Sequence, residues 1–598
     1  MPNTPLKRSL LAVYLLWAGL LHVHAQVDDN THFVVDSSAH FVVDSIEYKI
    51  ANAFDDNRKV TRFDAWLFSV GNHLRFKTRP SVLAQNIFFT AGDTVNLYDF
   101  AESERWLRRQ KFLSDAHISL RQGEQGENIV EVQSSDMWTT VIPIALSKPG
   151  DRWLWQLGLL ENNFLGLGKS VGLYYGRGEE NITWLVNYSD GNFWQKNNQL
   201  DLSYTWNADG FNGEFLLARP FLLSHRDEWA YTIAGQIRQM PRLIYWSENT
   251  LPVAKEYISS QNLQLVNAAG DSVKFPTYKP GVHANHLFSW QNLRRDSLSY
   301  RLARSWGGAR VAKVRAGFNY QKNASENPTI QRTVFREGDD YFAVDSSDLL
   351  QMFLPLRQDV RFGLGLEFSR LNYTKRHNFS HIKWTEDVQE GWVISAYIAK
   401  NQRALGASNN HWYGEADGQI SLGNSLHYFL ARAQQQAYWQ FGSSEINESK
   451  GQLKFEYIFK PTHRLGTAWS AEYKNINSAN FAESYFLGAN YGLEGFPAFF
   501  LAGKHSFYSR LEQRWYPDVE VLTLLPVFAA FVNAGQTAPT WDKLLDRNLQ
   551  WSAGISLRVG LSKSVEGVIN HLNLVWPLNG PLAGSKWPML AILASVSM

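Results

Sequence analysis

Two short motifs carry residue types and spacings that could bind a phosphate or a metal ion. The segment Gly166-Leu167-Gly168-Lys169-Ser170 resembles the end of a phosphate-binding loop, but Asn163 stands where such a loop requires its first glycine. His377 and His381 are four residues apart, which suits two metal ligands on a helix, whereas on a strand they lie about 13 Å apart. We therefore expect neither a nucleotide nor a metal at these positions, and no cofactor.

An acid–base cluster is the third candidate for chemistry. Glu102, Glu104 and Arg105 are close in sequence, but their spacing within a helical pattern makes them a solvated helix face. The chain has no Gly-x-Ser-x-Gly motif, no zinc-protease helix and no cysteine. These residues favour a protein that binds over one that catalyses.

Strands must position these residues, because apolar and polar side chains alternate over much of the chain. In residues 198–207, Leu200, Leu202, Tyr204 and Trp206 fall on one face and polar side chains on the other. The same period of two recurs in 452–459 and in 554–561. A strand with one apolar and one polar face suits a wall between lipid and water, so the pattern predicts a transmembrane antiparallel β-barrel.

Composition also favours strands over helices as membrane-crossing elements. Of 598 residues, 44% are hydrophobic and 14% aromatic, and 58 basic side chains balance 56 acidic ones. After the N-terminus no apolar run approaches the roughly 18 residues of a spanning helix, whereas about 10 tilted residues let a strand cross. The near-neutral charge offers no basic surface, so we expect no nucleic-acid partner.

The N-terminus has the pattern of an export signal. Lys7 and Arg8 precede an apolar stretch, and a small-residue cleavage site precedes Gln26. Residues 1–25 are therefore expected to be a signal peptide, with a retained membrane anchor as the alternative, and residues 26–40 to form a tether.

Two regions with different periodicity follow. Residues 41–138 have the pattern of a small α+β domain, in which Thr78 is expected to cap a short helix and a second helix is predicted over 97–111. From 139 to 598 the helical period disappears, and short turns alternate with long loops, as in an outer-membrane barrel. Periodicity alone leaves the number of strands open.

Several motifs occur in an order that points to one family. Segments 102–108 and 112–116 are similar to the second helix and following strand of a POTRA module. Asn163, Gly166 and Gly168 stand where an Asn-x-x-Gly-x-Gly turn opens a barrel, and Arg219-Pro220-Phe221 is similar to a recurrent strand end. Together they resemble the superfamily of POTRA-bearing outer-membrane barrels, the bacterial surface antigen family, which includes BamA, TamA and the two-partner secretion transporters.

The resemblance implies a loop near 485–503 that folds into the barrel and docks on lumen-facing groups of the late strands. The family motif of this loop is Arg-Gly-aromatic. The matching residues here are Leu493, Glu494, Gly495 and Phe496, so the arginine has become an acid. The family's wall motif, Phe-x-Asp-x-Gly, is present as Phe531, Asn533 and Gly535, so its carboxylate is missing as well.

Both charged residues of the family's usual ion pair are therefore replaced in this chain. Arg558 follows on a strand whose alternation points it into the lumen, and we hypothesise a reversed pair between Glu494 and Arg558. A solvated Glu494 in a wide lumen is the alternative. Glu512 and Arg514, on the strand after the loop, complete the candidate wall partners.

The last part of the chain sets an expected strand number. Five strands are predicted after the loop, at 506–516, 521–534, 550–562, 568–578 and 588–598. The resemblance to sixteen-stranded barrels implies this number. The expected fold is thus an all-β transmembrane antiparallel barrel of sixteen strands over residues 139–598, preceded by a single α+β POTRA domain.

The resemblance implies a function in the bacterial outer membrane, with the POTRA domain in the periplasm. Such a protein inserts, assembles or exports other proteins, and its partners are outer-membrane lipid and client polypeptides. The clients are expected to bind the POTRA sheet edge and the seam between the first and last barrel strands. A passive or lipid-conducting pore is the alternative, and a dedicated exporter of one protein is a third reading. The one enzyme class left open, a membrane-barrel lipase, has no catalytic set in this sequence.

Overall fold

The computed structural model describes most of the chain from residue 40 onward. The described residues are 40–53, 69, 72, 75–147, 154–177, 182–194, 197–208, 210–222, 227–245, 265–267, 272–273, 288–307, 313–325, 329–337, 340–344, 358–377, 385–440, 446–478, 484–489, 492–496, 500–517, 519–521, 523–546, 548–561, 569–580, 583–584 and 587–595. The expected signal peptide, almost all of the expected tether and His381 lie outside them.

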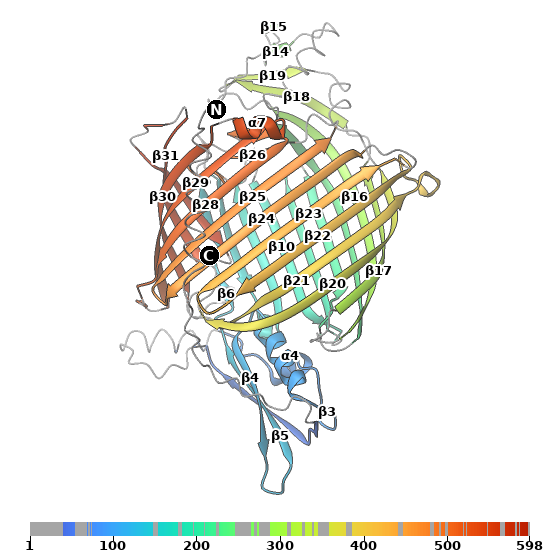
Figure 1. Cartoon of the computed structure of the whole chain (residues 1–598), viewed down its shortest axis with the longest axis vertical. Coiled ribbons are helices and arrows are strands. Elements are labelled where there is room, and N and C mark those ends of the chain that lie inside the picture. Colours follow the sequence, from blue (N-terminus) through green and yellow to red (C-terminus); the bar gives the residue numbers. More distant parts are fainter. Residues whose placement is uncertain are drawn as a thin grey trace, which may run out of the picture.

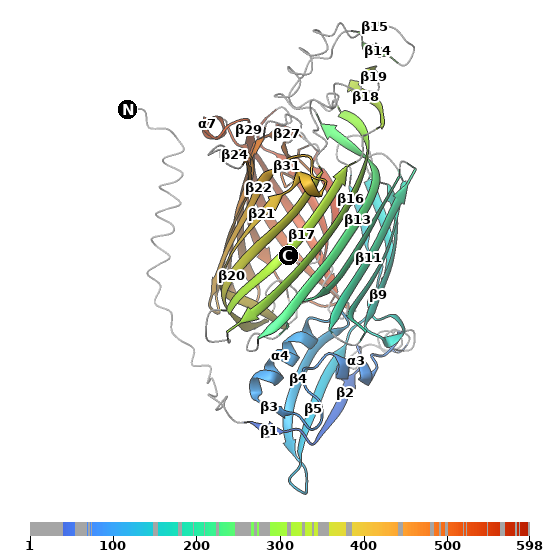
Figure 2. The same ribbon diagram turned by 90° about the vertical axis from the view of Figure 1, so that its right-hand side faces the viewer.

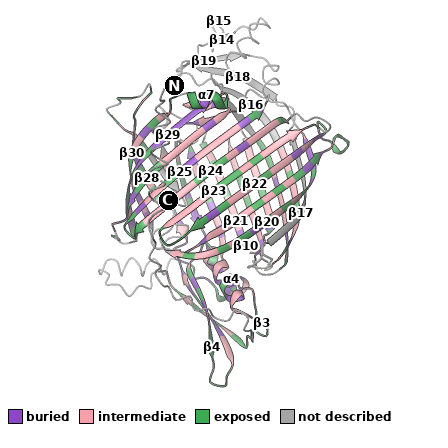
Figure 3. Ribbon diagram, in the orientation of Figure 1, coloured by how far each residue is buried: buried purple, intermediate pink, exposed green. Residues whose placement is uncertain are grey.

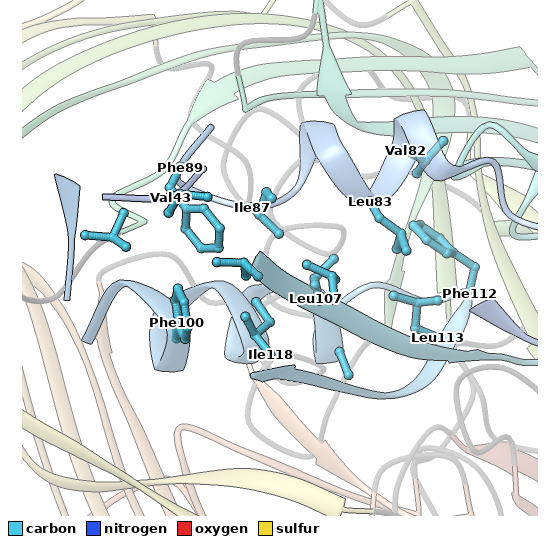
Figure 4. Packing of buried hydrophobic residues seen from close by; sticks show 14 residues of the cluster. Val43, Val82, Leu83, Ile87, Phe89, Phe100, Leu107, Phe112, Leu113 and Ile118 are labelled. Atoms are coloured by element: carbon cyan, nitrogen blue, oxygen red, sulfur yellow. The ribbon is translucent and has the colours of Figure 1, made fainter. Parts of the chain in front are cut away.

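The N-terminal domain is built on a three-stranded sheet in the order β2 (Ser45–Ala51), β5 (Asn128–Asp136), β4 (Leu113–Gln122). β2 runs parallel to β5 and β4 antiparallel to it, and the short strands β1 (Phe41–Val42) and β3 (Thr94–Val95) pair separately. The helices α3 (Pro80–Gln85) and α4 (Leu97–Arg108) contribute to one buried apolar cluster with the sheet (Figure 4). Burial of this cluster is what holds the small domain together.

Local sequence explains where the second helix begins. The Asn96 side chain accepts hydrogen bonds from the backbone N–H groups of Tyr98 (2.9 Å) and Asp99 (3.2 Å), and the Asp99 carboxylate accepts from the Asn96 N–H (3.0 Å). This reciprocal capping satisfies N–H groups that have no partner within a helix. Phe100 and Leu107 then fall on the buried face, and Leu107 is fully enclosed.

The expected role of Thr78 as a helix cap is wrong. The N-cap of α3 is Arg79, whose side chain makes no capping bond, while Pro80 supplies the first helical residue. The Thr78 N–H donates instead to Asp136 (3.0 Å), and its hydroxyl accepts from the Asn163 amide (2.9 Å). Thr78 therefore belongs to the junction between the domain and the barrel.

A closed antiparallel barrel forms the rest of the described chain (Figure 1). Its wall strands are β6 (Thr140–Val141) with β7 (Ile144–Ser147), β8 (Leu154–Glu161), β9 (Lys169–Arg177), β10 (Ile182–Phe193), β11 (Asn198–Asn207), β12 (Gly210–Arg219), β13 (Glu228–Tyr245), β16 (Phe288–Trp306), β17 (Lys313–Ser325), β20 (Asp359–His377), β21 (Thr385–Asn401), β22 (His411–Gly423), β23 (His427–Trp439), β24 (Ile446–Thr462), β25 (Leu465–Ser478), β28 (His505–Trp515), β29 (Leu524–Ala538), β30 (Gln550–Leu561), β31 (Ile569–Pro577) and β32 (Met589–Ser595).

The wall has more strands than the sixteen expected. Since β6 and β7 both pair with β8 and act as one interrupted strand, the described residues form twenty wall strands, fifteen before the inward loop and five after it. The five late strands match the sequence prediction in number and place. The difference therefore lies wholly before the loop, where periodicity left the count open.

Apolar side chains face outward along the wall. In β20, Phe362, Leu364, Leu366 and Phe368 are exposed, while the residues between them are buried or half-buried. Figure 3 shows buried, intermediate and exposed residues interleaved along single strands. Because neighbouring side chains of a strand point to opposite faces, the outer surface is an apolar belt around a more polar interior. Among the described helices, none is both long and apolar enough to cross a membrane.

The two ends of the barrel differ. The N-terminal domain lies below one end, and α7 (Trp541–Asp546) lies at the other, as two views at right angles agree (Figure 1, Figure 2). At the α7 end lie the small strands β14 (Leu265–Asn267), β15 (Ser272–Val273), β18 (Thr329–Glu337) and β19 (Asp340–Val344). His377 ends strand β20 and is not part of a helix, so the metal spacing considered above does not apply to it.

Candidate functional site: the inward loop

The segment between β25 and β28 forms a short hairpin and a buried turn. Its strands β26 (Tyr485–Leu487) and β27 (Leu501–Gly503) pair with each other and not with the barrel sheet. Leu487, Leu493 and Phe496 form one buried cluster, in which Phe500 stacks on Phe496 with ring centroids 4.6 Å apart. Leu493 and Phe496 are completely enclosed, so the loop is anchored by apolar packing on both sides of Glu494.

Glu494 makes two specific contacts with the wall. One carboxylate oxygen accepts a hydrogen bond from Arg510 Nη1 of β28 at 2.8 Å, and the other accepts from the Asn573 amide of β31, also at 2.8 Å. Arg510 and Glu494 are both largely buried, with side-chain exposures of 17% and 14%. The bond to a charged donor in this partly dry setting is stronger than a surface ion pair.

Arg510 connects the loop to a chain of charges on the wall. It also binds Glu512 at 3.0 Å, and Glu512 in turn binds Arg514 at 2.5 Å and Arg558 of β30. The three arginines and Glu512 face the interior, on the same side of their strands as the other buried residues. Two carboxylates and three guanidinium groups therefore form one network beneath the loop, and its chemistry is ion pairing without a nucleophile or a proton-transfer pair.

Two glycines lie where the loop packs tightly against the wall, and only Gly495 has a left-handed backbone. Gly495 has φ +90°, and a Cβ there would lie 2.9 Å from Val575 Cγ1 and 3.1 Å from Ser552 Cβ. A Cβ at Gly535 would lie 3.0 Å from Leu487 Cδ1 and 3.4 Å from Leu493 Cδ1. The glycine of the loop motif and the glycine of the wall motif thus both allow close approach.

Of the other two wall-motif residues, Phe531 contacts the same network and Asn533 bonds two neighbouring hydroxyl groups. Phe531 lies under Arg510, with 3.8 Å between the guanidinium carbon and the ring centroid. Asn533 accepts from the Tyr508 hydroxyl at 3.2 Å and donates to the Ser552 hydroxyl at 3.3 Å. The neutral amide of Asn533 satisfies these hydroxyl groups. The cation that pairs with Glu494 lies on the preceding strand, β28.

The hypothesised pair of Glu494 and Arg558 is wrong in its partner. A loop carboxylate does meet a wall guanidinium, but the guanidinium is that of Arg510, and Arg558 binds Glu512. Sequence reasoning missed Arg510 and Asn573. Arg510 could have been found, because it shares the alternation of Glu512 and Arg514; nothing in the sequence marks Asn573, which is brought to the loop from β31 by the barrel's curvature.

The barrel-start motif lies at a junction. Asn163 donates to Thr78 Oγ1 at 2.9 Å and accepts from the Gly168 N–H at 2.8 Å, so it fixes the turn between β8 and β9 against the N-terminal domain. Gly166 and Gly168 have φ +73° and +67°. A Cβ at Gly166 would collide with the carbonyl of Lys77, and one at Gly168 with the Phe112 ring. These three residues therefore connect the two parts of the chain.

A second attachment holds helix α4 against the barrel rim. Arg108 forms a two-fold hydrogen bond with Asp387 of β21, at 2.9 Å for each oxygen, and Lys375 of β20 binds Glu104 at 2.9 Å. Arg105 lies over the Tyr373 ring, 4.0 Å from its centroid. The expectation of a solvated face at Glu102, Glu104 and Arg105 is thus wrong, because this helix face is covered by another part of the chain.

No group of three or more histidine, aspartate or glutamate residues suited to a metal ion occurs in the described part of the chain. The fold and the loop define a class of protein: a closed antiparallel barrel with a loop docked inside it and a small α+β domain at one end. In this chain the acid of the loop, Glu494, is paired with an arginine of the wall, Arg510.

Comparison with solved structures finds similar proteins over nearly the whole chain. BamA from Haemophilus ducreyi lacking POTRA domains 1–3 is 12% identical over 92% of this chain and 84% of its own, with a TM-score of 0.35. CdiB from Escherichia coli is 12% identical over 100% of both chains (TM-score 0.42), and CdiB from Acinetobacter baumannii 9% identical over 98% and 97% (TM-score 0.37). No family model and no curated protein matches the sequence.

Proposed function

We propose that this protein lies in the bacterial outer membrane, with its N-terminal domain in the periplasm, and assembles or exports other polypeptides by binding them at a seam in the barrel wall. The apolar outer belt supports the membrane location. The mechanism is strand recognition without covalent chemistry, since a strand with unpaired backbone groups offers a row of donors and acceptors to a client.

The observation that carries this proposal is the seam between β7 and β32. Among the described residues, these strands pair at two positions, Ala591 with Ser147 and Ile592 with Leu146. By contrast, β13 and β16 pair over eighteen positions. Because each ladder position contributes backbone hydrogen bonds, we infer that the wall opens at this join, which has the fewest described positions. An opened seam would present two strand edges on which a client strand can pair.

The N-terminal sheet offers a second edge at which a client strand could pair. The pairing of its strands favours one of them for this role. β5 is the central strand, so its backbone is occupied on both sides. On β4, the Ile118 N–H already donates to Glu104 and the Ala116 carbonyl accepts from Arg108. The outer edge of β2 pairs with no other described strand, so β2 is the edge proposed to receive a client by β-augmentation.

Site-specific photocrosslinking in intact cells tests this function. Probes belong at Ala591 and Leu593 on the last strand and at the exposed positions Ser45 and Ala51 on β2. Ile129 and Glu131 on the central strand, one strand farther from the free edge, are the matched positions. Crosslinks to nascent outer-membrane or secreted polypeptides at the first four positions are the expected result. Crosslinks to lipid alone, together with a steady ion conductance of the purified protein, would instead establish a passive pore.

A further inference from the structure

A partly polar cavity lies where the N-terminal domain meets one rim of β9 and β10, and it shares no lining residue with the inward loop or with the paired residues of the seam. Its volume is about 270 Å³. From the domain it is lined by Ser81, Gln85 and Gln110, and from the barrel by Lys169, Asp190 and Asn192, with Trp194 at the turn that follows β10. We propose that this cavity binds one pyranose ring of a neutral saccharide.

The lining offers hydrogen-bonding groups that the protein does not use. Among the described residues, the Ser81 hydroxyl and the Gln85 side-chain amide have no hydrogen-bond partner, and Gln110 uses only its amide nitrogen, which donates to the Trp106 carbonyl at 3.0 Å. Donors and acceptors of this neutral kind match the hydroxyl groups of a sugar, each of which both donates and accepts. Polar groups fixed in a concave site give orientation to a small ligand.

Trp194 supplies the apolar surface that such a ligand needs. Its side chain is 70% exposed, and its backbone has φ +57°, a left-handed conformation that is rare for a bulky residue. The Phe193 ring packs beside it, with centroids 4.4 Å apart. An exposed indole held in a strained turn at the edge of a polar cavity suits stacking on the C–H face of a pyranose ring.

Other ligand classes fit the cavity less well. The one cation among its lining residues, Lys169, is already bound to Asp190 at 3.1 Å, so no free positive charge is available for an anion. β9 and β10 are paired on both sides, so an extended peptide would find no open strand edge. The volume is also at the low end for small-molecule sites, which suits a single ring.

Gly191 is a position at which a side chain can be added toward the cavity. Gly191 lines it, and a Cβ added there would meet only the Gln110 Oε1 atom, at 3.7 Å. Gly191→Leu should therefore occupy the space meant for the ring, while Trp194→Ala should remove the stacking surface. The matched controls are Gly418→Leu, where an added Cβ meets nothing within 4 Å on another wall strand, and Trp587→Ala, a tryptophan that is 82% exposed elsewhere.

Binding is measured on the full chain in a detergent without a sugar headgroup, by saturation-transfer NMR and calorimetry with triacetylchitotriose as the probe. We expect saturable binding that weakens about tenfold in Trp194→Ala and is lost in Gly191→Leu, with both controls unchanged. Co-sedimentation with purified cell-wall sacculi distinguishes a glycan polymer from a free oligosaccharide as the source. An absence of saturable trisaccharide binding, binding that the two cavity variants leave intact, or binding of an unglycosylated peptide in its place would overturn the proposal. None of these outcomes depends on the seam or on client crosslinks.

Discussion

The guanidinium carbon of Arg510 lies 3.8 Å from the centroid of the Phe531 ring, so two lumen-facing groups of adjacent strands are in cation–π contact. The same guanidinium binds Glu494 of the loop and Glu512 of the wall. Phe531 therefore fixes the position of the cation that joins the two carboxylates. The docking of the loop depends on this three-part arrangement and not on a single exposed ion pair.

Glu494→Gln should loosen the loop without unfolding the barrel. The change removes the charge that faces Arg510 and weakens a charge-assisted hydrogen bond worth about 1.5–3 kcal/mol. Hydrogen exchange at residues 492–496 should accelerate about tenfold or more. Glu472→Gln is the matched control, because Glu472 binds Lys474 on the wall strand β25. Equal protection in both variants would contradict a docking role for Glu494.

Glu512→Gln should cost more stability than Glu494→Gln. Glu512 is 3% exposed and binds three arginines, so its loss leaves buried positive charges without their common partner. Breaking a buried pair in this way costs about 3–5 kcal/mol. The midpoint of thermal unfolding in detergent, followed by heat-dependent gel mobility, should fall further for Glu512→Gln. The reverse order would show that the network is not centred on Glu512.

Gly495→Ala should displace the turn of the loop. At φ +90° an alanine is strained, and its Cβ would crowd Val575 and Ser552, for a total cost of about 1–3 kcal/mol. Limited proteolysis should cut the loop faster in this variant. Gly418→Ala serves as the control, since its backbone is not left-handed and the added Cβ meets open space. An uncut loop in Gly495→Ala would mean that the turn has another stable conformation.

The attachment of α4 to the rim should weaken in acid. Burial alone would raise the pKa of Glu104, but hydrogen bonds from the Ile118 N–H and Lys375 and the positive charge of Lys375 hold its pKa below the ordinary value. A carboxyl with a lowered folded pKa contributes stability that is complete above its unfolded pKa, about 4.3, and is lost as the pH falls through the folded value. Exchange protection of α4 should therefore decrease below about pH 4, and Glu104→Gln should abolish that pH dependence. A pH profile identical in the two proteins would place the titration elsewhere.

A disulfide across the seam should block client passage. The chain has no cysteine, so Leu146→Cys with Ile592→Cys introduces a single pair at a position where β7 and β32 are in register. Oxidation should abolish crosslinks from Ala591 to clients, and reduction should restore them. A matched pair at Tyr300 and Ile233, which are in register on β16 and β13, should leave crosslinking unchanged. Client passage through the oxidised seam would rule out a lateral exit.

Much of the late barrel could be predicted from the sequence, because strict alternation fixes which side chains face the lumen. Ser556 and Arg558 are buried where the period of two places them, and the five late strands occur near the predicted ranges. The strand number before the loop could not be predicted. There the connections are long, and periodicity does not tell a wall strand such as β17 from a loop strand such as β18.

Contacts between distant segments were the other part that the sequence could not supply. A helical pattern assigns Glu104 and Arg108 to a polar face, but whether that face meets water or a barrel rim depends on Lys375 and Asp387, more than 270 positions away. The partner of Glu494 was ambiguous for the same reason. Three wall arginines, at 510, 514 and 558, share the lumen-facing alternation, and only the stagger of the strands brings Arg510 to Glu494.

The docked loop ties several wall strands together from inside the barrel. It touches β28 through Arg510, β29 through Gly535, β30 through Ser552 and β31 through Asn573, and so braces four consecutive strands that end next to the seam. The strands that the loop contacts are therefore stiffened from inside the barrel, whereas β8 to β10 on the other side of the seam are held at the end that meets the N-terminal domain, through Asn163 and Asn192. Any widening of the seam should therefore bend the wall at β8 to β12, at the end away from the N-terminal domain, and leave β28 to β31 rigid.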